Sequence, residues 1–164
     1  SEIQENAIVI DSVSKRYSMC GARIGCIISK NAEFISTAMK FAQARLSPPT
    51  LAQIASTAAM DVGEEYFDSV INEYNERRKF SMKALSDIGF TYGDPGGAFY
   101  IYTNVSNSNM TASTFCKELL VNTGVLMFPG TLFGDEDDKY IRLSYLQPIE
   151  KIEESMTRIN NFLR

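Results

Sequence analysis

The chain has 164 residues, 45% of them hydrophobic and 22% charged, and it carries a net charge of −4 at pH 7. This size and composition are typical of a globular protein with one sizeable core, and the acidic balance excludes the basic surface of a nucleic-acid-binding protein. No apolar stretch approaches the roughly 20 residues of a membrane span, and residues 1–6 are polar, unlike a signal peptide. We therefore expect a cytoplasmic protein with neither a membrane nor a nucleic-acid partner.

Histidine is absent from the sequence, and the three cysteines are Cys20, Cys26 and Cys116. Without histidine the chain cannot carry Ser-His-Asp or Cys-His catalysis. The cysteines match no zinc-binding spacing, so we expect reduced thiols and no metal site.

Apolar periodicity, capping residues and chain breakers predict a mixture of strands and helices. Strands are expected over residues 7–10, 23–28, 98–102, 125–128 and 140–145. Helices are expected over residues 31–44, 49–62, 64–88, 111–122 and 149–163. Asn31 is placed to cap the first of these helices, while Gly89 and Gly124 are placed to end the third and the fourth.

The predicted elements form two pieces of an α/β chain. Residues 1–62 contain two short buried strands, too few for a self-standing parallel sheet, so this piece should have apolar surface that needs a partner. Residues 63–164 fit a nearly complete small α+β domain, which begins with the long helix that joins the two pieces.

A lysine, Lys15, stands on the turn between the first two predicted strands, in the sequence Ser12-Val13-Ser14-Lys15. Lysine in such a place suits an amine nucleophile that forms a Schiff base with a carbonyl group. Ser12 and Ser14 add hydroxyl donors beside it. The simpler alternative is a surface lysine in a polar turn.

Arg23 follows on the same turn, between Gly21 and Gly25. Its planar donor fork is suited to gripping a phosphate, and the flanking glycines favour a close approach of the backbone to a ligand. Together with the amine and the hydroxyls, this arginine suits a phosphorylated carbonyl cofactor such as pyridoxal phosphate. The simpler alternative is an ion pair with Asp11 or a glutamate.

A second arginine, Arg142, lies between Ile141 and Leu143 on the last predicted strand. A cation on an apolar strand is costly unless it is paired. It could pair with one of the acidic residues at 135–138, or it could clamp a carboxylate with two parallel hydrogen bonds. The acidic run lacks the glycine and the spaced glutamate of a calcium loop, so we expect it to form a solvated turn.

Four blocks in this order resemble the class I/II pyridoxal-phosphate aminotransferases of aspartate aminotransferase type. The blocks are the serine–lysine–arginine motif of residues 12–25, Gly96-Gly97-Ala98-Phe99-Tyr100, residues 125–130 with Phe133-Gly134, and Tyr140-Ile141-Arg142-Leu143-Ser144-Tyr145. Members of this family are more than twice as long. The resemblance therefore implies the C-terminal portion of a type I pyridoxal-phosphate-dependent transferase fold, with the tail of the large domain in residues 1–62 and the small domain in residues 63–164.

The resemblance also implies roles for the candidate residues. Lys15 would be the catalytic residue and would hold pyridoxal 5'-phosphate. Ser12, Ser14 and Arg23 would bind the cofactor as well, through its phosphate. Arg142 would bind the α-carboxylate of the substrate.

The implied reaction transfers an amino group between an L-amino acid and a 2-oxo acid, with aspartate-type substrates favoured and a homodimer as the full-length assembly. Several cofactor-binding segments of the family have no counterpart in this chain, so we expect the isolated chain to be inactive. Two alternatives stay open. The chain could be a non-catalytic fragment or interaction domain, or the parent enzyme could be a lyase, a decarboxylase or a ring-forming synthase of the same fold.

Overall fold

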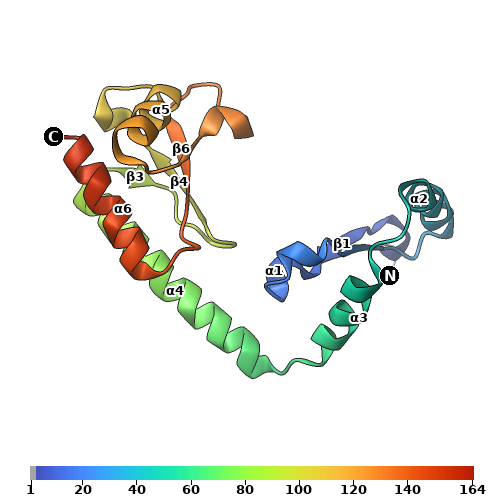
Figure 1. The fold of residues 1–164 in the computed structure, drawn as a ribbon. Helices are drawn as coiled ribbons and strands as arrows, with labels where there is room; N and C mark the ends of the chain where they lie inside the picture. The colour runs from blue at the N-terminus through green and yellow to red at the C-terminus, as the bar shows by residue number, and fades with distance from the viewer. Residues whose placement is uncertain (1–2) are drawn as a thin grey trace. The chain divides into compact units, whose positions relative to one another are not determined.

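The computed structural model describes residues 3–164, which divide into two compact units after Phe67 (Figure 1). The division falls inside helix α4 (Glu64–Asp87), five residues beyond the boundary predicted between residues 62 and 63. The assignment of these units to a large and a small domain of a longer enzyme stays a prediction. Over residues 3–164, every helix is too short or too polar to span a lipid bilayer.

The N-terminal unit is built around one pair of antiparallel strands, β1 (Val9–Ser12) and β2 (Gly25–Ile28). Its other elements are η1 (Gln4–Asn6), α1 (Val13–Arg16), η2 (Cys20–Ala22), α2 (Ala32–Arg45), α3 (Thr50–Ala58) and η3 (Ala59–Asp61). A parallel pair would need a long crossover, whereas the segment between β1 and β2 holds only two short turns of helix. The two strands both begin two residues later than the sequence predicted.

The apolar side chains of this strand pair are exposed. This agrees with the expectation that residues 1–62 have apolar surface that needs a partner, but not with the expectation that the strands themselves are buried. Ile10 is 78% exposed and Ile28 is 56% exposed, while Val13, at the start of α1, is buried. A short run of apolar residues indicates a strand, but it does not supply the layer that covers the strand. Within the described residues, no other element of this unit buries these faces.

The predicted helix start at Asn31 is confirmed. The Asn31 side chain accepts a hydrogen bond from the N–H of Phe34 at 2.9 Å, which satisfies one of the N–H groups left without a partner at the start of α2. The next helix, α3, is shorter than the predicted range 49–62. It ends at Ala58, and the chain continues as the single 3-10 turn η3.

The C-terminal unit contains a four-stranded antiparallel sheet in the order β3-β4-β6-β5. After α4 its elements are β3 (Thr91–Tyr92), β4 (Tyr100–Asn104), η4 (Ser106–Ser108), α5 (Ala112–Thr123), β5 (Phe128–Pro129), η5 (Gly130–Phe133), β6 (Tyr140–Ser144) and α6 (Ile149–Phe162). The predicted strand at 125–128 is reduced to two paired residues. Gly89 and Gly124 adopt positive φ angles of 83° and 73° at the helix ends, as predicted.

The core of this unit lies between one face of the sheet and helices α4, α5 and α6. Side chains alternate along the two central strands, so that Ile101 and Leu143 are buried while Tyr102 and Ser144 are exposed. The helices contribute Leu85, Phe115, Leu119, Ile152, Met156 and Ile159 to the same cluster. The opposite face of the sheet is therefore left for polar and aromatic residues.

The acidic turn at residues 135–138 is hydrogen-bonded to the first turn of α5. Asp138 Oδ1 accepts hydrogen bonds from the backbone N–H and the hydroxyl of Ser113, at 2.9 and 2.8 Å. Desolvation raises the pKa of Asp138, but hydrogen bonds from Ser113 and Thr111 outweigh it, so the pKa lies below its usual range. The charged carboxylate therefore stabilises the folded unit.

Replacing Asp138 with asparagine should lower the free energy of unfolding at pH 7 by about 1 kcal/mol, the scale of a helix N-terminal cap. Because the folded-state pKa is depressed, the wild-type advantage is present above the pKa of an unfolded aspartate and is lost as the pH falls through the folded-state value. Urea unfolding followed by circular dichroism, repeated from neutral to acid pH, measures the difference. Asp137→Asn, at an exposed ion pair with Lys139, is the matched control and should change little. A difference for Asp138→Asn that does not depend on pH would contradict this account.

The three cysteines lie in different environments. Cys116 on α5 is buried, and this desolvation, with a smaller contribution from the charge of Asp138, raises the pKa of its thiol to about 11. Cys20 and Cys26 are exposed. The reactive thiolate form of Cys116 is therefore almost absent at neutral pH.

In the folded 164-residue chain, a disulfide reagent such as Ellman's should modify two thiols quickly at pH 8 and the third only after denaturation. The variant Cys116→Ala should keep both fast thiols and lose the slow one. Three fast thiols in the native wild type would show that Cys116 is accessible.

Candidate functional site

The predicted nucleophile, Lys15, lies on the single helical turn α1, which directly follows β1 (Figure 1). Ser12 ends β1 and begins this turn, because its Oγ accepts a hydrogen bond from the N–H of Ser14 at 3.2 Å. The N–H of Val13 donates to the carbonyl of Ile24 at 3.2 Å and so continues the strand pairing by one step. Lys15 is exposed and stands just beyond the end of the strand pair.

Arg23 is brought to the same end of the strand pair. It directly precedes Ile24, the residue that pairs with the start of α1, and it adopts a left-handed φ of 55°. One guanidinium nitrogen, Nη1, donates to the carbonyl of Cys20 at 3.1 Å. The ion pair between Arg23 and Asp11 that the sequence left open is not formed, since Asp11 pairs with Arg16 at 3.3 Å instead.

The two glycines that flank Arg23 differ in their surroundings. A Cβ atom on Gly25 would lie 2.9 Å from the carbonyl oxygen of Asp11 and 3.3 Å from Cβ of Ser12. Gly25 therefore permits the close approach of β1, its own neighbouring strand. A Cβ on Gly21 would meet no atom of the described residues within 4 Å, and the expected approach of a ligand there stays a prediction.

The groups gathered at this end suit both ends of pyridoxal phosphate. Lys15 provides a primary amine for the carbonyl, and Arg23 provides N–H donors beyond the one bound to Cys20. Ser12 uses its oxygen as an acceptor in the cap, so its hydroxyl hydrogen can still be donated, and Ser14 adds a second hydroxyl. This donor set fits a phosphate and an aldehyde.

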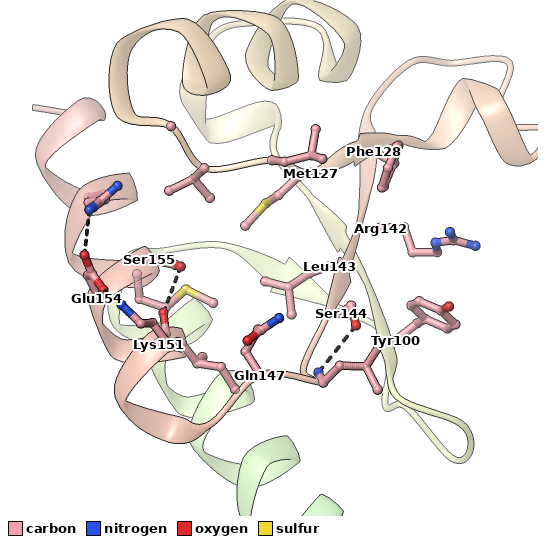
Figure 2. Close-up of a pocket in the computed structure, with 17 residues that line it drawn as sticks. Tyr100, Met127, Phe128, Arg142, Leu143, Ser144, Gln147, Lys151, Glu154 and Ser155 are labelled. Carbon is pink, nitrogen blue, oxygen red and sulfur yellow. Dashed lines mark hydrogen bonds and ion pairs between the residues drawn. The ribbon is translucent and has the colours of Figure 1, made fainter. Parts of the chain in front are cut away.

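Arg142, in the C-terminal unit, lies on β6 opposite Tyr102 of β4. Its guanidinium carbon, Cζ, is 4.3 Å from the ring centre of Tyr100 and 3.7 Å from that of Phe133. Figure 2 shows the side chain extending from β6 on the side away from Lys151. The guanidinium is thus stacked against two aromatic rings on the face of the sheet opposite the core.

The alternative of an ion pair between Arg142 and the acidic turn is wrong for residues 3–164, in which none of the ion pairs includes Arg142. Asp135 instead accepts hydrogen bonds from the backbone N–H groups of Lys139 and Tyr140, at 3.1 and 2.9 Å. Asp137 pairs with Lys139, and Asp138 accepts hydrogen bonds from Ser113. No group of three or more acidic or cysteine side chains placed to hold a metal ion occurs in this described part of the chain.

A cleft of about 630 Å³ runs between β6, the segment at residues 124–128 and α6 (Figure 2). Its cations on α6 are already paired. Lys151 and Arg158 bind the two carboxylate oxygens of Glu154 at 2.8 and 2.6 Å. Of the three cations that line this cleft within residues 3–164, Arg142 is the one without a carboxylate partner, and its side chain extends on the other side of β6 from Lys151.

Sequence reasoning missed the two rings that hold Arg142. Tyr100 and Phe133 both lie within the blocks that carry the family resemblance. Their spacing in the sequence gave no indication of a contact with Arg142. Register would have suggested one of them, since Tyr100 lies diagonally across from Arg142 on the neighbouring strand. Phe133 reaches the guanidinium from a loop, which no strand pattern predicts.

Comparison with known proteins gives the family. The sequence pattern described as "Aminotransferase class I and II" matches residues 2–159. A (5-formylfuran-3-yl)methyl phosphate transaminase from Methanocaldococcus jannaschii is 36% identical over 97% of this chain and 42% of its own length. An aspartate aminotransferase from Pyrococcus horikoshii is 33% identical, over 97% of this chain and 41% of its own length.

The fold agrees with this result. A crystal structure of an aminotransferase from Mycobacterium tuberculosis matches 99% of this chain and 43% of its own chain, with a TM-score of 0.87 and 30% identity. This chain therefore spans about two fifths of the length of the relatives it matches. Because the family pattern covers almost all of its residues, the chain belongs to the class I and II aminotransferases.

Proposed function

We propose that this chain is the C-terminal part of a pyridoxal-phosphate-dependent aminotransferase that moves an amino group between an L-amino acid and a 2-oxo acid. Two observations support the proposal together. The chain belongs to the aminotransferase family, and the Arg142 guanidinium lies against two aromatic rings without a carboxylate partner among the described residues. Aspartate-type substrates are favoured, although the relatives include a transaminase of a phosphorylated furan as well as aspartate aminotransferases.

In this proposal Lys15 performs the proton chemistry. Its Nζ amine holds the cofactor in the resting enzyme and then moves a proton to and from the substrate Cα. Pyridoxal phosphate, when bound, supplies the electron sink that makes this proton acidic. Lys15 lies on the helical turn α1, which directly follows β1, so its backbone is close to the end of that strand.

Ser12, Ser14 and Arg23 hold the cofactor phosphate in the same proposal. The cap between Ser12 and Ser14 fixes the backbone that carries both hydroxyls, and the bond from Arg23 to Cys20 restrains the guanidinium. Arg142 binds the α-carboxylate through two parallel hydrogen bonds and so orients the Cα–H bond for proton removal.

The isolated 164 residues are proposed to be inactive alone, because the chain spans about two fifths of its relatives and the apolar faces of β1 and β2 are exposed. That exposure favours a second state for the isolated chain, a non-catalytic piece that associates with a partner. The full-length enzyme is proposed to be a cytoplasmic homodimer.

Replacing Lys15 with alanine in the full-length enzyme should lower the rate of transamination by on the order of a thousandfold or more, since the amine and proton carrier are lost. Circular dichroism should show an unchanged fold. The matched control is Lys30→Ala, an exposed lysine of the same unit, which should keep wild-type turnover. Turnover of the Lys15 variant at a tenth of the wild-type rate would show that the assignment is wrong.

Replacing Arg142 with lysine should raise the KM for the amino acid by roughly ten- to a hundredfold, because an ammonium group cannot reproduce the two parallel bonds of a guanidinium. The affinity for pyridoxal phosphate, measured by titration of the apoenzyme, should stay unchanged. Equal losses of substrate and cofactor affinity would indicate that Arg142 has a structural role instead.

A further inference from the structure

The aromatic stack around Arg142 differs from the usual way of holding a half-buried cation. Proteins commonly place a carboxylate beside such an arginine, which neutralises it and occupies its N–H groups. Here the rings of Tyr100 and Phe133 lie at 4.3 and 3.7 Å from Cζ. Aromatic faces attract a cation and restrict its motion, but they accept few of its N–H hydrogen bonds.

Two consequences follow for a ligand. First, the positive charge is not neutralised by a carboxylate within the described residues, so an incoming carboxylate does not have to displace one. Second, rings that cover the guanidinium leave its edge, where the N–H groups lie, as the place for a bidentate contact. An arginine held in this way loses less side-chain entropy when the ligand binds.

The position of Phe133 is fixed by the turn that carries it. Gly130 begins this turn and is buried, and a Cβ there would clash with the Tyr102 hydroxyl and would lie 2.8 Å from Cβ of Asp135. The N–H of Asp135 closes the turn by donating to the Gly130 carbonyl at 3.1 Å, while its carboxylate accepts from the N–H of Tyr140. The acidic residue nearest in sequence to Phe133 therefore accepts hydrogen bonds from the backbone, and it forms no ion pair with Arg142 within residues 3–164.

We propose that Phe133, with Tyr100, is a positioning residue that holds the Arg142 guanidinium with its N–H edge open to the substrate carboxylate. This inference rests on the proposed function for the identity of the ligand, but the stack itself does not. The ring of Phe133 acts through Arg142 and makes no bond to the substrate. Loss of the ring should therefore weaken carboxylate binding while the arginine is still present.

The proposal is tested on the 164-residue chain by following the Nε–H resonance of Arg142 in nuclear magnetic resonance spectra. Protons that lie against ring faces are shifted upfield, so the wild-type resonance should be displaced from its random-coil position. Phe133→Leu keeps an apolar side chain in the turn but removes the ring, and the resonance should move back toward the random-coil position. Phe133→Tyr should restore the displacement. Leu132→Ala, at an exposed neighbour in the same turn, should leave it unchanged.

Titration with 2-oxoglutarate then measures carboxylate binding at the same resonance. Phe133→Leu should weaken binding by roughly tenfold, the scale of a cation–π contact at a partly desolvated site, and Phe133→Tyr should bind like wild type. An Nε–H at its random-coil position in the wild type, or wild-type affinity in Phe133→Leu, would overturn the proposal.

Full-length kinetics separate this inference from the proposed function. In an active aminotransferase, Phe133→Leu should raise the KM of the amino acid roughly tenfold and change kcat much less. An unchanged KM would overturn the positioning role even if Lys15 proves essential. A wild-type enzyme that transaminates nothing would refute the proposed function, while the resonance and titration on the chain still decide the role of Phe133.

Discussion

The antiparallel register between strands decides where each candidate site residue lies. In the C-terminal unit Tyr102 is paired with Arg142, so that Ile101 and Leu143 face the core and the arginine faces away from it. A slip of one residue would exchange the two faces and bury the guanidinium without a partner, which is strongly unfavourable. The buried residues of β4 and β6 therefore place the cation on the opposite face of the sheet, where Tyr100 of β4 and Phe133 of the turn before β6 contact it.

The same constraint acts in the N-terminal unit through a glycine. Gly25 lies opposite Ser12, and any larger residue would push apart the strands that carry the lysine turn and Arg23. The consequence is a short strand pair whose end gathers an amine, a guanidinium and two hydroxyls, while apolar residues such as Ile10 stay exposed. The strand pair β1 and β2 therefore places the candidate site residues at one end while its apolar side chains stay exposed. This combination is consistent with the proposal that the two strands are part of a larger sheet.

Local signals allowed much of the fold to be predicted, because caps and chain breakers act through neighbouring residues. Asn31 begins one helix and Gly124 ends another, each through a hydrogen bond to a residue three or four positions away, and the sequence shows both. The exposure of Ile10 follows from there being only two strands in residues 1–62, and the sequence predicted this apolar surface even though it also predicted buried strands. The candidate lysine and arginines were found from motifs, but the stack of Phe133 on Arg142 joins a loop to a strand and has no local signature.

Reductive trapping tests the central claim, that Lys15 is the cofactor lysine, most directly. The full-length enzyme is loaded with pyridoxal phosphate, reduced with borohydride and digested, and the labelled peptide is identified by mass spectrometry. We expect one stoichiometric label, carried by Lys15. Selective labelling of Lys30 or Lys40, the other lysines of the N-terminal unit, or labelling spread over many exposed lysines, would contradict it.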